Sequence, residues 1–233
     1  MSTKKSKVRP AGSIDAVRRK TLMGMTACAA GSLGAGRLMA QAAECVLTPD
    51  AGEGPFYFDP ERVRADIVDR MPGAPLAIAL RVVRSGDCRP IAGARIDVWH
   101  ADGIGLYSGY RRQPGVGLPT TPAVGQQYLR GTQFTATDGW VRFRTIFPSW
   151  YGGRTPHVHF KVIVDGEEAL ASQAFFPDEI SRDVFEKWDP YREHASKRTV
   201  FNTNDPLFDG VVSVIDRNDE NGVSASADIT VTV

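Results

Sequence analysis

The chain has 233 residues, of which 42% are hydrophobic and 24% are charged. These values are typical of a globular protein and exclude a chain that is disordered throughout. The formal net charge is only +1, but the positive charge is concentrated near the N-terminus. The 23 glycines and 15 prolines favour a turn-rich β fold over a helical bundle.

Residues 1–42 have the layout of a secretory signal peptide. Seven Lys and Arg residues lie within 1–20, an uncharged stretch follows over 21–36, and Ala40-Gln41-Ala42 fits a small-x-small cleavage site. The Arg18-Arg19 pair before a weakly hydrophobic core indicates the twin-arginine type. We therefore predict cleavage after Ala42 and export to the periplasm or the extracellular space. The alternative is a basic tail that binds nucleic acid.

The remaining residues, 43–233, are predicted to form one domain. Eight of the 28 basic residues and one of the 27 acidic residues lie in 1–42, so 43–233 carry 20 basic and 26 acidic residues and a net charge near −6. This balance argues against nucleic acid as a partner. Cys45 and Cys88 are the two cysteines outside the predicted signal peptide. In an exported chain such a pair predicts a disulfide, with two buried free thiols as the alternative.

Five segments of this domain show the apolar alternation that is typical of β-strands. In chain order they are 76–82, 94–100, 140–146, 157–164 and 225–233. Turn signals containing glycine separate them, for example at 85–87 and 137–139. One short helix is predicted near 178–188, after a Pro-Asp pair. Short strands between such turns predict an all-β fold, a β-sandwich with long loops.

His157 and His159 are the first candidate metal ligands. Residues two apart on a strand point to the same side, so both imidazoles face one way while Val158 and Phe160 face the core. Two imidazoles side by side can chelate a metal. A His-x-His pair can equally be exposed or form structural hydrogen bonds, and we interpret the other two histidines, His100 and His194, as structural.

Two tyrosines lie on glycine-rich loops. Tyr107 follows the predicted strand 94–100, and Tyr151 is separated from Arg154 by Gly152-Gly153. Glycine permits loop conformations that bring such side chains to a common point. Either tyrosine alone is more often a packing residue.

Taken together, these segments resemble the intradiol ring-cleavage dioxygenases, the family of catechol 1,2-dioxygenase and protocatechuate 3,4-dioxygenase. The resemblance extends from about Thr48 to Phe176. The similar segments, in the order of the family, are Glu53-Gly-Pro-Phe-Tyr57, 93–103 followed by Tyr107, 143–148 followed by Tyr151, and Arg154-Thr-Pro-His-Val-His159. The last is similar to the family motif Arg-Pro-Ala-His-x-His, with Thr155-Pro156 in place of Pro-Ala. The resemblance implies a β-sandwich of the intradiol dioxygenase type.

The resemblance also implies a cofactor, a mononuclear non-haem Fe(III) held by Tyr107, Tyr151, His157 and His159. Phenolates are hard anionic donors that suit Fe(III), and imidazoles complete a mixed N/O site. The partners would be a small aromatic diol and O2. Both oxygen atoms would enter the diol, and cleavage between its two hydroxyl-bearing carbons would give a cis,cis-muconate-type product.

Further site residues are implied in the same way. Tyr151 would be the ligand that the diol displaces and that takes up a proton, and Arg154 would stabilise negative charge on the ring. Gln173 matches a polar position near the metal, and Pro55 and Tyr57 would line the substrate pocket.

The sequence is also compatible with two other functions. One is a non-catalytic exported β-sandwich that serves as a binding module, because fold alone does not imply function. The other is a copper- or zinc-binding protein that uses His157 and His159 with other donors. Whether copies of the chain form a homo-oligomer is also open.

Overall fold

The structure is a computed structural model that describes residues 45–113, 115–117 and 122–233. All of these residues belong to one compact unit, Gln41–Val233. The predicted signal peptide, 1–42, lies outside the described residues. No helix in the described ranges is long and apolar enough to cross a membrane.

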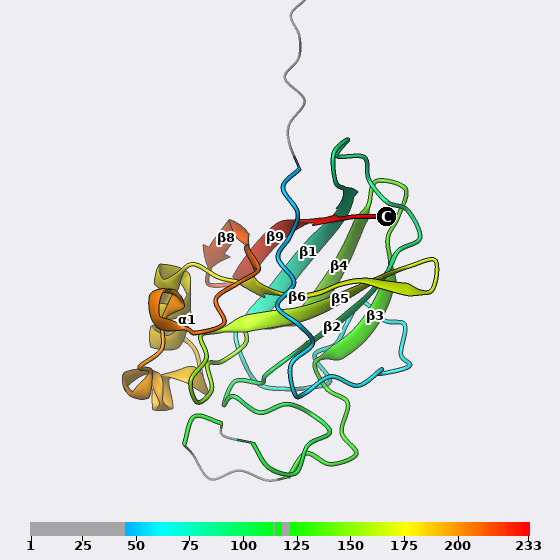
Figure 1. Ribbon diagram of the computed structural model, residues 1–233. Helices are drawn as coiled ribbons and strands as arrows, with labels where there is room; N and C mark the ends of the chain where they lie inside the picture. Colours follow the sequence, from blue (N-terminus) through cyan, green and yellow to red (C-terminus); the bar gives the residue numbers. More distant parts are fainter. Residues whose placement is uncertain (1–44, 114, 118–121) are drawn as a thin grey trace, which may run out of the picture. The chain divides into compact units, whose positions relative to one another are not determined.

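The strands of the described residues form two sheets, which confirms the predicted β-sandwich (Figure 1). One sheet is four-stranded, in the order β4-β1-β9-β8, and the other is five-stranded, in the order β3-β2-β5-β6-β7. Neighbouring strands are antiparallel except in the pairs β1·β9 and β6·β7. The bounds of the four-stranded sheet are β1 Pro75–Arg84, β4 Trp140–Ile146, β8 Val214–Asp219 and β9 Gly222–Val231. Those of the five-stranded sheet are β2 Arg95–His100, β3 Arg130–Phe134, β5 His157–Val164, β6 Glu167–Phe175 and β7 Val211–Val212.

The core lies between the two sheets and is built from the alternating apolar positions of their strands. Leu76, Ile78 and Leu80 of β1 are buried, as the alternation predicts. They belong to the same hydrophobic cluster as Val158 and Phe160 of β5. Burial of such large aliphatic and aromatic side chains is the main term that stabilises the fold.

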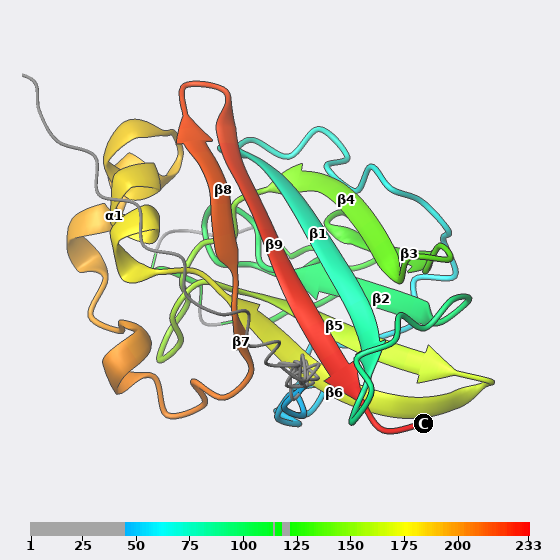
Figure 2. The same ribbon diagram turned by 90° about the horizontal axis from the view of Figure 1, so that it is seen from above.

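The predicted helix is present as α1, Asp178–Lys187, and the chain between β6 and β7 also contains the short 3-10 helices η1 Tyr191–Glu193, η2 Ala195–Lys197 and η3 Asn202–Asn204. The first turn of α1 carries the acidic residues Asp178 and Glu179, and its last turn carries Lys187. These charges interact favourably with the helix dipole. The side-chain amide of Asn218 on β8 donates a hydrogen bond to the carboxylate of Asp183 on α1 at 2.8 Å. The helix therefore lies at the β8 side of the four-stranded sheet (Figure 2).

The segment before β1 is fastened to both sheets. Thr48 exchanges backbone and side-chain hydrogen bonds with Thr230 of β9, and the amide of Ala51 donates to the Ala171 carbonyl of β6. A disulfide joins Cys45 to Cys88, as predicted. These bonds fix the path of residues 45–58, which continue onto the outer face of the five-stranded sheet.

Candidate active site

Strand β5 presents the two predicted histidine ligands away from the core. Val158 and Phe160 point between the sheets, so the alternation of the strand sends His157 and His159 to the outer face of the five-stranded sheet. Both histidines are nevertheless buried, at 2% and 1% exposure, because loops cover this face. Their Nε2 atoms are 3.0 Å apart. The histidines of β5 thus form a close imidazole pair beneath the loops.

A backbone carbonyl fixes the tautomer of His157. Its Nδ1 lies 2.7 Å from the carbonyl oxygen of Thr155, which can only accept a hydrogen bond. Nδ1 therefore carries the proton, and Nε2 is left with a lone pair that faces His159 and Tyr107. Metal-binding histidines almost always donate their other ring N–H in this way.

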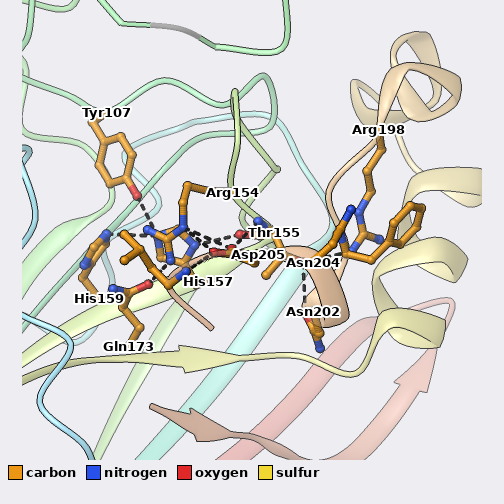
Figure 3. A network of polar contacts seen from close by, with 12 residues as sticks. Tyr107, Arg154, Thr155, His157, His159, Gln173, Arg198, Asn202, Asn204 and Asp205 are labelled. Atoms are coloured by element: carbon orange, nitrogen blue, oxygen red, sulfur yellow. Dashed lines mark hydrogen bonds and ion pairs between the residues drawn. The ribbon is translucent and has the colours of Figure 1, made fainter. Parts of the chain in front are cut away.

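Tyr107 reaches the histidine pair from the loop that follows β2. The side chain of Asp102 shapes this loop by accepting hydrogen bonds from the amides of Ile104 and Leu106, each at 2.9 Å. Tyr107 is completely buried, and its hydroxyl oxygen is 3.4 Å from Nε2 of His157 (Figure 3). Fifty residues separate these two side chains in the sequence.

Tyr151 completes the cluster from a tight turn before β5. The Arg154 amide donates to the Tyr151 carbonyl at 2.9 Å, and Gly153 between them has a φ of +86°, which favours glycine. The rings of Tyr107 and Tyr151 meet edge to face with centroids 5.6 Å apart, and the ring of Tyr151 also lies 5.6 Å from that of His157. Two phenols and two imidazoles thus converge on one buried point.

Burial controls the protonation of all four side chains. It raises the pKa of Tyr107 well above its usual range and also raises that of Tyr151. It lowers the pKa of His157 to about 3, and the pKa of His159 falls well below its ordinary value for the same reason. In the metal-free protein the imidazoles are therefore neutral, which is their metal-binding form, and the phenols keep their protons until a metal binds.

Arg154 lies beside the cluster in a polar network (Figure 3). Its Nε donates to both carboxylate oxygens of Asp205, at 2.9 and 3.1 Å, and its Nη2 donates to the side-chain oxygen of Gln173. Its positive charge partly offsets the rise in pKa that burial gives the Tyr151 hydroxyl. Gln173 shares this face of the sheet because it pairs with His159 across β5 and β6. The structure thus brings both predicted polar residues to the phenol and imidazole cluster.

Two aromatic side chains enclose the cluster. Phe56 stacks on Tyr107, with centroids 4.5 Å apart and rings inclined by 20°, and meets the edge of Tyr151. Trp99 of β2 stacks on His159 at 5.0 Å. Phe56 lies between the two residues that we predict to line the substrate pocket. The structure places Pro55 on the exposed side of the segment.

The second predicted pocket residue, Tyr57, packs beside the cluster rather than over it. Its hydroxyl donates to Asp97 at 2.9 Å, and its ring contacts Trp99, with centroids 4.7 Å apart. Contact of Pro55 and Tyr57 with substrate stays a prediction.

The other two histidines have structural partners, as expected from the sequence. His100 is buried and bonds the Ala101 carbonyl at 2.8 Å and the Thr145 hydroxyl at 2.7 Å. His194 bonds the Ser149 hydroxyl at 3.0 Å.

The donor set indicates which kind of metal would fit. Within the described ranges there is no group of three or more His, Cys, Asp and Glu side chains that could hold a metal ion. Zinc sites are usually built from those residue types. Two phenols that become anionic on binding, together with two neutral imidazoles, instead suit a hard trivalent cation. The Thr155 carbonyl that orients His157 is the supporting contact such a site needs.

Comparison with known proteins places this cluster in a family. A family model described as "Dioxygenase" matches residues 52–201, which include all four convergent side chains. The chain belongs to the intradiol dioxygenase family. A solved intradiol ring-cleavage dioxygenase from Tetranychus urticae has a TM-score of 0.72 and 31% identity, covering 81% of this chain and 95% of that one. A solved dioxygenase domain from Streptomyces sp. SirexAA-E has a TM-score of 0.60 and 29% identity, covering 81% and 99%.

Curated members of the intradiol dioxygenase family are also similar in sequence. Catechol 1,2-dioxygenase 1 of Acinetobacter lwoffii is 32% identical, over 54% of this chain and 45% of that protein. Chlorocatechol 1,2-dioxygenase of Pseudomonas putida is 33% identical, over 53% of this chain and 52% of that protein. The chain spans about half the length of the curated relatives that it matches.

Sequence reasoning did not single out three residues that the structure places at the candidate site. Phe56 and Trp99 lie within the motifs that carry the resemblance, so the sequence contains a signal for them. Asp205 has no such signal, because it lies 51 residues after its partner Arg154 and beyond the matched range.

Proposed function

We propose that this protein is an Fe(III)-dependent intradiol dioxygenase that inserts both atoms of O2 into a catechol-type aromatic diol. The observation that carries the proposal is the convergence of two tyrosine side chains and two imidazoles on one buried point. The relatives named catechol, chlorocatechol and hydroxyquinol 1,2-dioxygenases support this class of substrate. Cleavage between the two hydroxyl-bearing carbons would give a cis,cis-muconate-type dicarboxylate.

The residues that would hold the iron are Tyr107, Tyr151, His157 and His159. When bound, Fe(III) supplies coordination positions for both diol oxygens and withdraws electron density from the aromatic ring, which makes a ring carbon reactive toward O2. The protein contributes two phenols whose protons must leave on loading, so iron uptake releases protons and tightens as the pH rises.

Tyr151 is the proton acceptor in this proposal. Its hydroxyl oxygen would take a proton from one diol hydroxyl as the diol replaces it, acting as a general base. Tyr151 sits on a turn that contains Gly152 and Gly153 and is 6% exposed, whereas Tyr107 is completely buried. Tyr151 therefore has more freedom to leave, and Tyr107 is assigned as the retained ligand.

Arg154 would stabilise the negative charge that develops on the ring-derived oxygens. A fixed cation is effective where water is largely excluded, and Arg154 is only 8% exposed. The side-chain oxygen of Gln173 and the carboxylate of Asp205 hold the guanidinium in place. Phe56 shields the two tyrosines from the solvent side.

A visible absorption spectrum tests this proposal. The purified protein, loaded with Fe(III) at one ion per chain, should show a broad tyrosinate-to-iron band that shifts when catechol is added without oxygen. Addition of 18O2 should then place two labelled oxygen atoms in the product. A protein that stays colourless after iron loading and does not respond to catechol would contradict the ligand assignment.

Tyrosine variants separate the dioxygenase from the copper- or zinc-binding alternative. Tyr107→Phe and Tyr151→Phe should each weaken the band and iron binding, whereas Tyr128→Phe, a tyrosine outside the convergent cluster, should leave both unchanged. If both cluster variants keep full metal affinity, the histidine pair binds metal with other donors. If the wild type binds no metal, the binding-module alternative is favoured.

We also propose that the enzyme acts after export. The basic residues, uncharged stretch and Ala40-Gln41-Ala42 site of the first 42 residues support export, as does the Cys45–Cys88 disulfide, a bond typical of oxidising compartments. Cell fractionation should find the wild type in the exported fraction and the doubly substituted Arg18→Lys, Arg19→Lys protein in the cytoplasm. Equal distribution of the two would argue against a twin-arginine signal.

A further inference from the structure

A buried carboxylate holds together two parts of the candidate active site. The side chain of Asp205 has no exposed surface. Its oxygens accept hydrogen bonds from Nε of Arg154 at 2.9 and 3.1 Å and from the backbone amide of Thr155 at 2.7 Å (Figure 3). A third donor, the amide of Leu207 at 2.9 Å, fixes the carboxylate to its own segment.

The two contacts of Asp205 reach different components of the site. The contact with Nε leaves Nη2 of Arg154 free to bond Gln173. The contact with the Thr155 amide fixes the residue whose carbonyl accepts the Nδ1 proton of His157. One carboxylate thus sets both the direction of the active-site cation and the position of the peptide that orients a histidine ligand.

The segment that carries Asp205, residues 205–212, is itself attached to the site strand β6. Its end forms β7, which pairs with Ala174 and Phe175 in parallel. The ring of Phe208 packs on Phe175, with centroids 4.7 Å apart. Gly210 lies directly against the Gln173 carbonyl, where a side chain would not fit. Asp205 is therefore held rigidly relative to the strand that bears Gln173.

Stability alone does not account for this arrangement. Burying a carboxylate and a guanidinium together costs a desolvation energy that often offsets their attraction, so a buried ion pair is weak evidence for a stabilising role. The four donor contacts instead impose one geometry on Arg154 and Thr155. Catalysis at a metal site depends on such fixed positions, both for the ligands of the metal and for the charged groups that face the substrate.

We propose that Asp205 is a positioning residue of the ring-cleavage reaction, which holds Arg154 toward the substrate and fixes Thr155 behind the histidine ligand His157. The inference rests on the proposed function. Asp205 lies just beyond residues 52–201, so the match to the family model does not include it. Its contribution is carried by the contacts alone.

Asp205→Asn tests this role, because it preserves the shape of the side chain but replaces one acceptor oxygen with a donor facing Arg154 or Thr155. The matched control is Asp209→Asn, an exposed aspartate four residues later with the same loss of charge. We expect Asp205→Asn to lower kcat by about 10- to 100-fold, with KM changed by less than about threefold. Asp209→Asn should behave like the wild type.

A double-mutant comparison identifies the residue through which Asp205 acts. In an Arg154→Gln background, Asp205→Asn should lower kcat by a smaller factor than in the wild-type background, because the contact with Arg154 is already missing and only the contact with Thr155 is left to lose. A second measurement needs no metal and no turnover: amide hydrogen exchange of Thr155 should be faster in the metal-free Asp205→Asn protein than in Asp209→Asn. If Asp205→Asn does not fold, Asp205→Glu replaces it, because it keeps the charge and displaces the carboxylate by one methylene.

Three results would overturn the proposal. They are a kcat for Asp205→Asn equal to that of Asp209→Asn, an equal loss in the wild-type and Arg154→Gln backgrounds, and unchanged exchange at Thr155. If Asp205→Glu is used in place of Asp205→Asn, a kcat equal to that of the wild type would also overturn the proposal. Failure of the proposed function gives a different pattern, since the wild type would then cleave no diol while the exchange experiment would still report on the contact.

Discussion

Gly54 provides a sharp test of how the segment before β1 supports the metal site. A Cβ added at Gly54 would lie 3.2 Å from Cε1 of His159, which is closer than an ordinary carbon–carbon contact. The imidazole also stacks on Trp99, and this contact limits the movement of the ring. Gly54→Ala should therefore displace a metal ligand by a few tenths of an ångström.

Gly52 supplies a matched control for the backbone cost. Its φ is +71°, nearly the same as the +73° of Gly54, but a Cβ at Gly52 would meet no atom within 4 Å. An alanine in this left-handed conformation costs roughly 1–2 kcal/mol, so both variants should lose about that much stability. Only Gly54→Ala should also lose iron affinity, by about 10- to 100-fold, as is usual when a supporting contact of a metal ligand is disturbed.

Two assays separate these effects. Urea unfolding of the metal-free proteins measures the backbone cost, and competition titration with Fe(III) measures affinity, with the visible band as a second reading. Equal iron affinities and identical spectra for Gly52→Ala and Gly54→Ala would refute the reasoning. A comparable loss of affinity in both variants would show that strain in the segment, and not contact with His159, controls the site.

Two further predictions concern stability. Replacing Cys45 and Cys88 by serine opens a disulfide with a sequence separation of 43, and the chain-entropy model predicts a loss of about 4 kcal/mol in the free energy of unfolding. Denaturant unfolding would contradict this if the loss were below about 1 kcal/mol. Burial raises the pKa of the Asp102 carboxyl from 3.8 to about 6. Because the folded pKa is raised, the contribution of the carboxyl is present below the unfolded pKa and is lost as the pH rises through the folded one. Asp102→Asn, which keeps the acceptor for Ile104 and Leu106, should gain up to about 3 kcal/mol over the wild type between about pH 4 and pH 7. A difference that does not change with pH would show that the carboxyl titrates normally.

The strands that send every second side chain into the core could be predicted from the sequence. The alternation in 76–82, 140–146 and 157–164 reappears in β1, β4 and β5, because each strand buries every second side chain in the core. The spacing of His157 and His159 fixed their common direction for the same local reason. The cysteine pair followed from composition, since two cysteines lie outside the predicted signal peptide.

Other strands carry no such signal. The second half of β6 is buried on both faces, so its apolar residues do not alternate with polar ones. Strand β3 contains Arg130 and Gly131, both poor indicators of a strand, and β8 is largely exposed and rich in Asp, Asn and Arg. The positions of β3 and β8 depend on their pairing with β2 and β9, respectively, and such pairing is not a local property of the sequence.

Local sequence thus determined the strand faces and the direction of the histidine pair, and the family motifs indicated which tyrosines accompany it. Only the tertiary structure decided how those residues meet. The order β2-β5-β6 places Trp99, His159 and Gln173 side by side on three strands. The return of the chain after α1 brings Asp205 to Arg154 across 51 residues. These contacts depend on sheet order and loop path, because residues distant in sequence become neighbours only when the strands have paired.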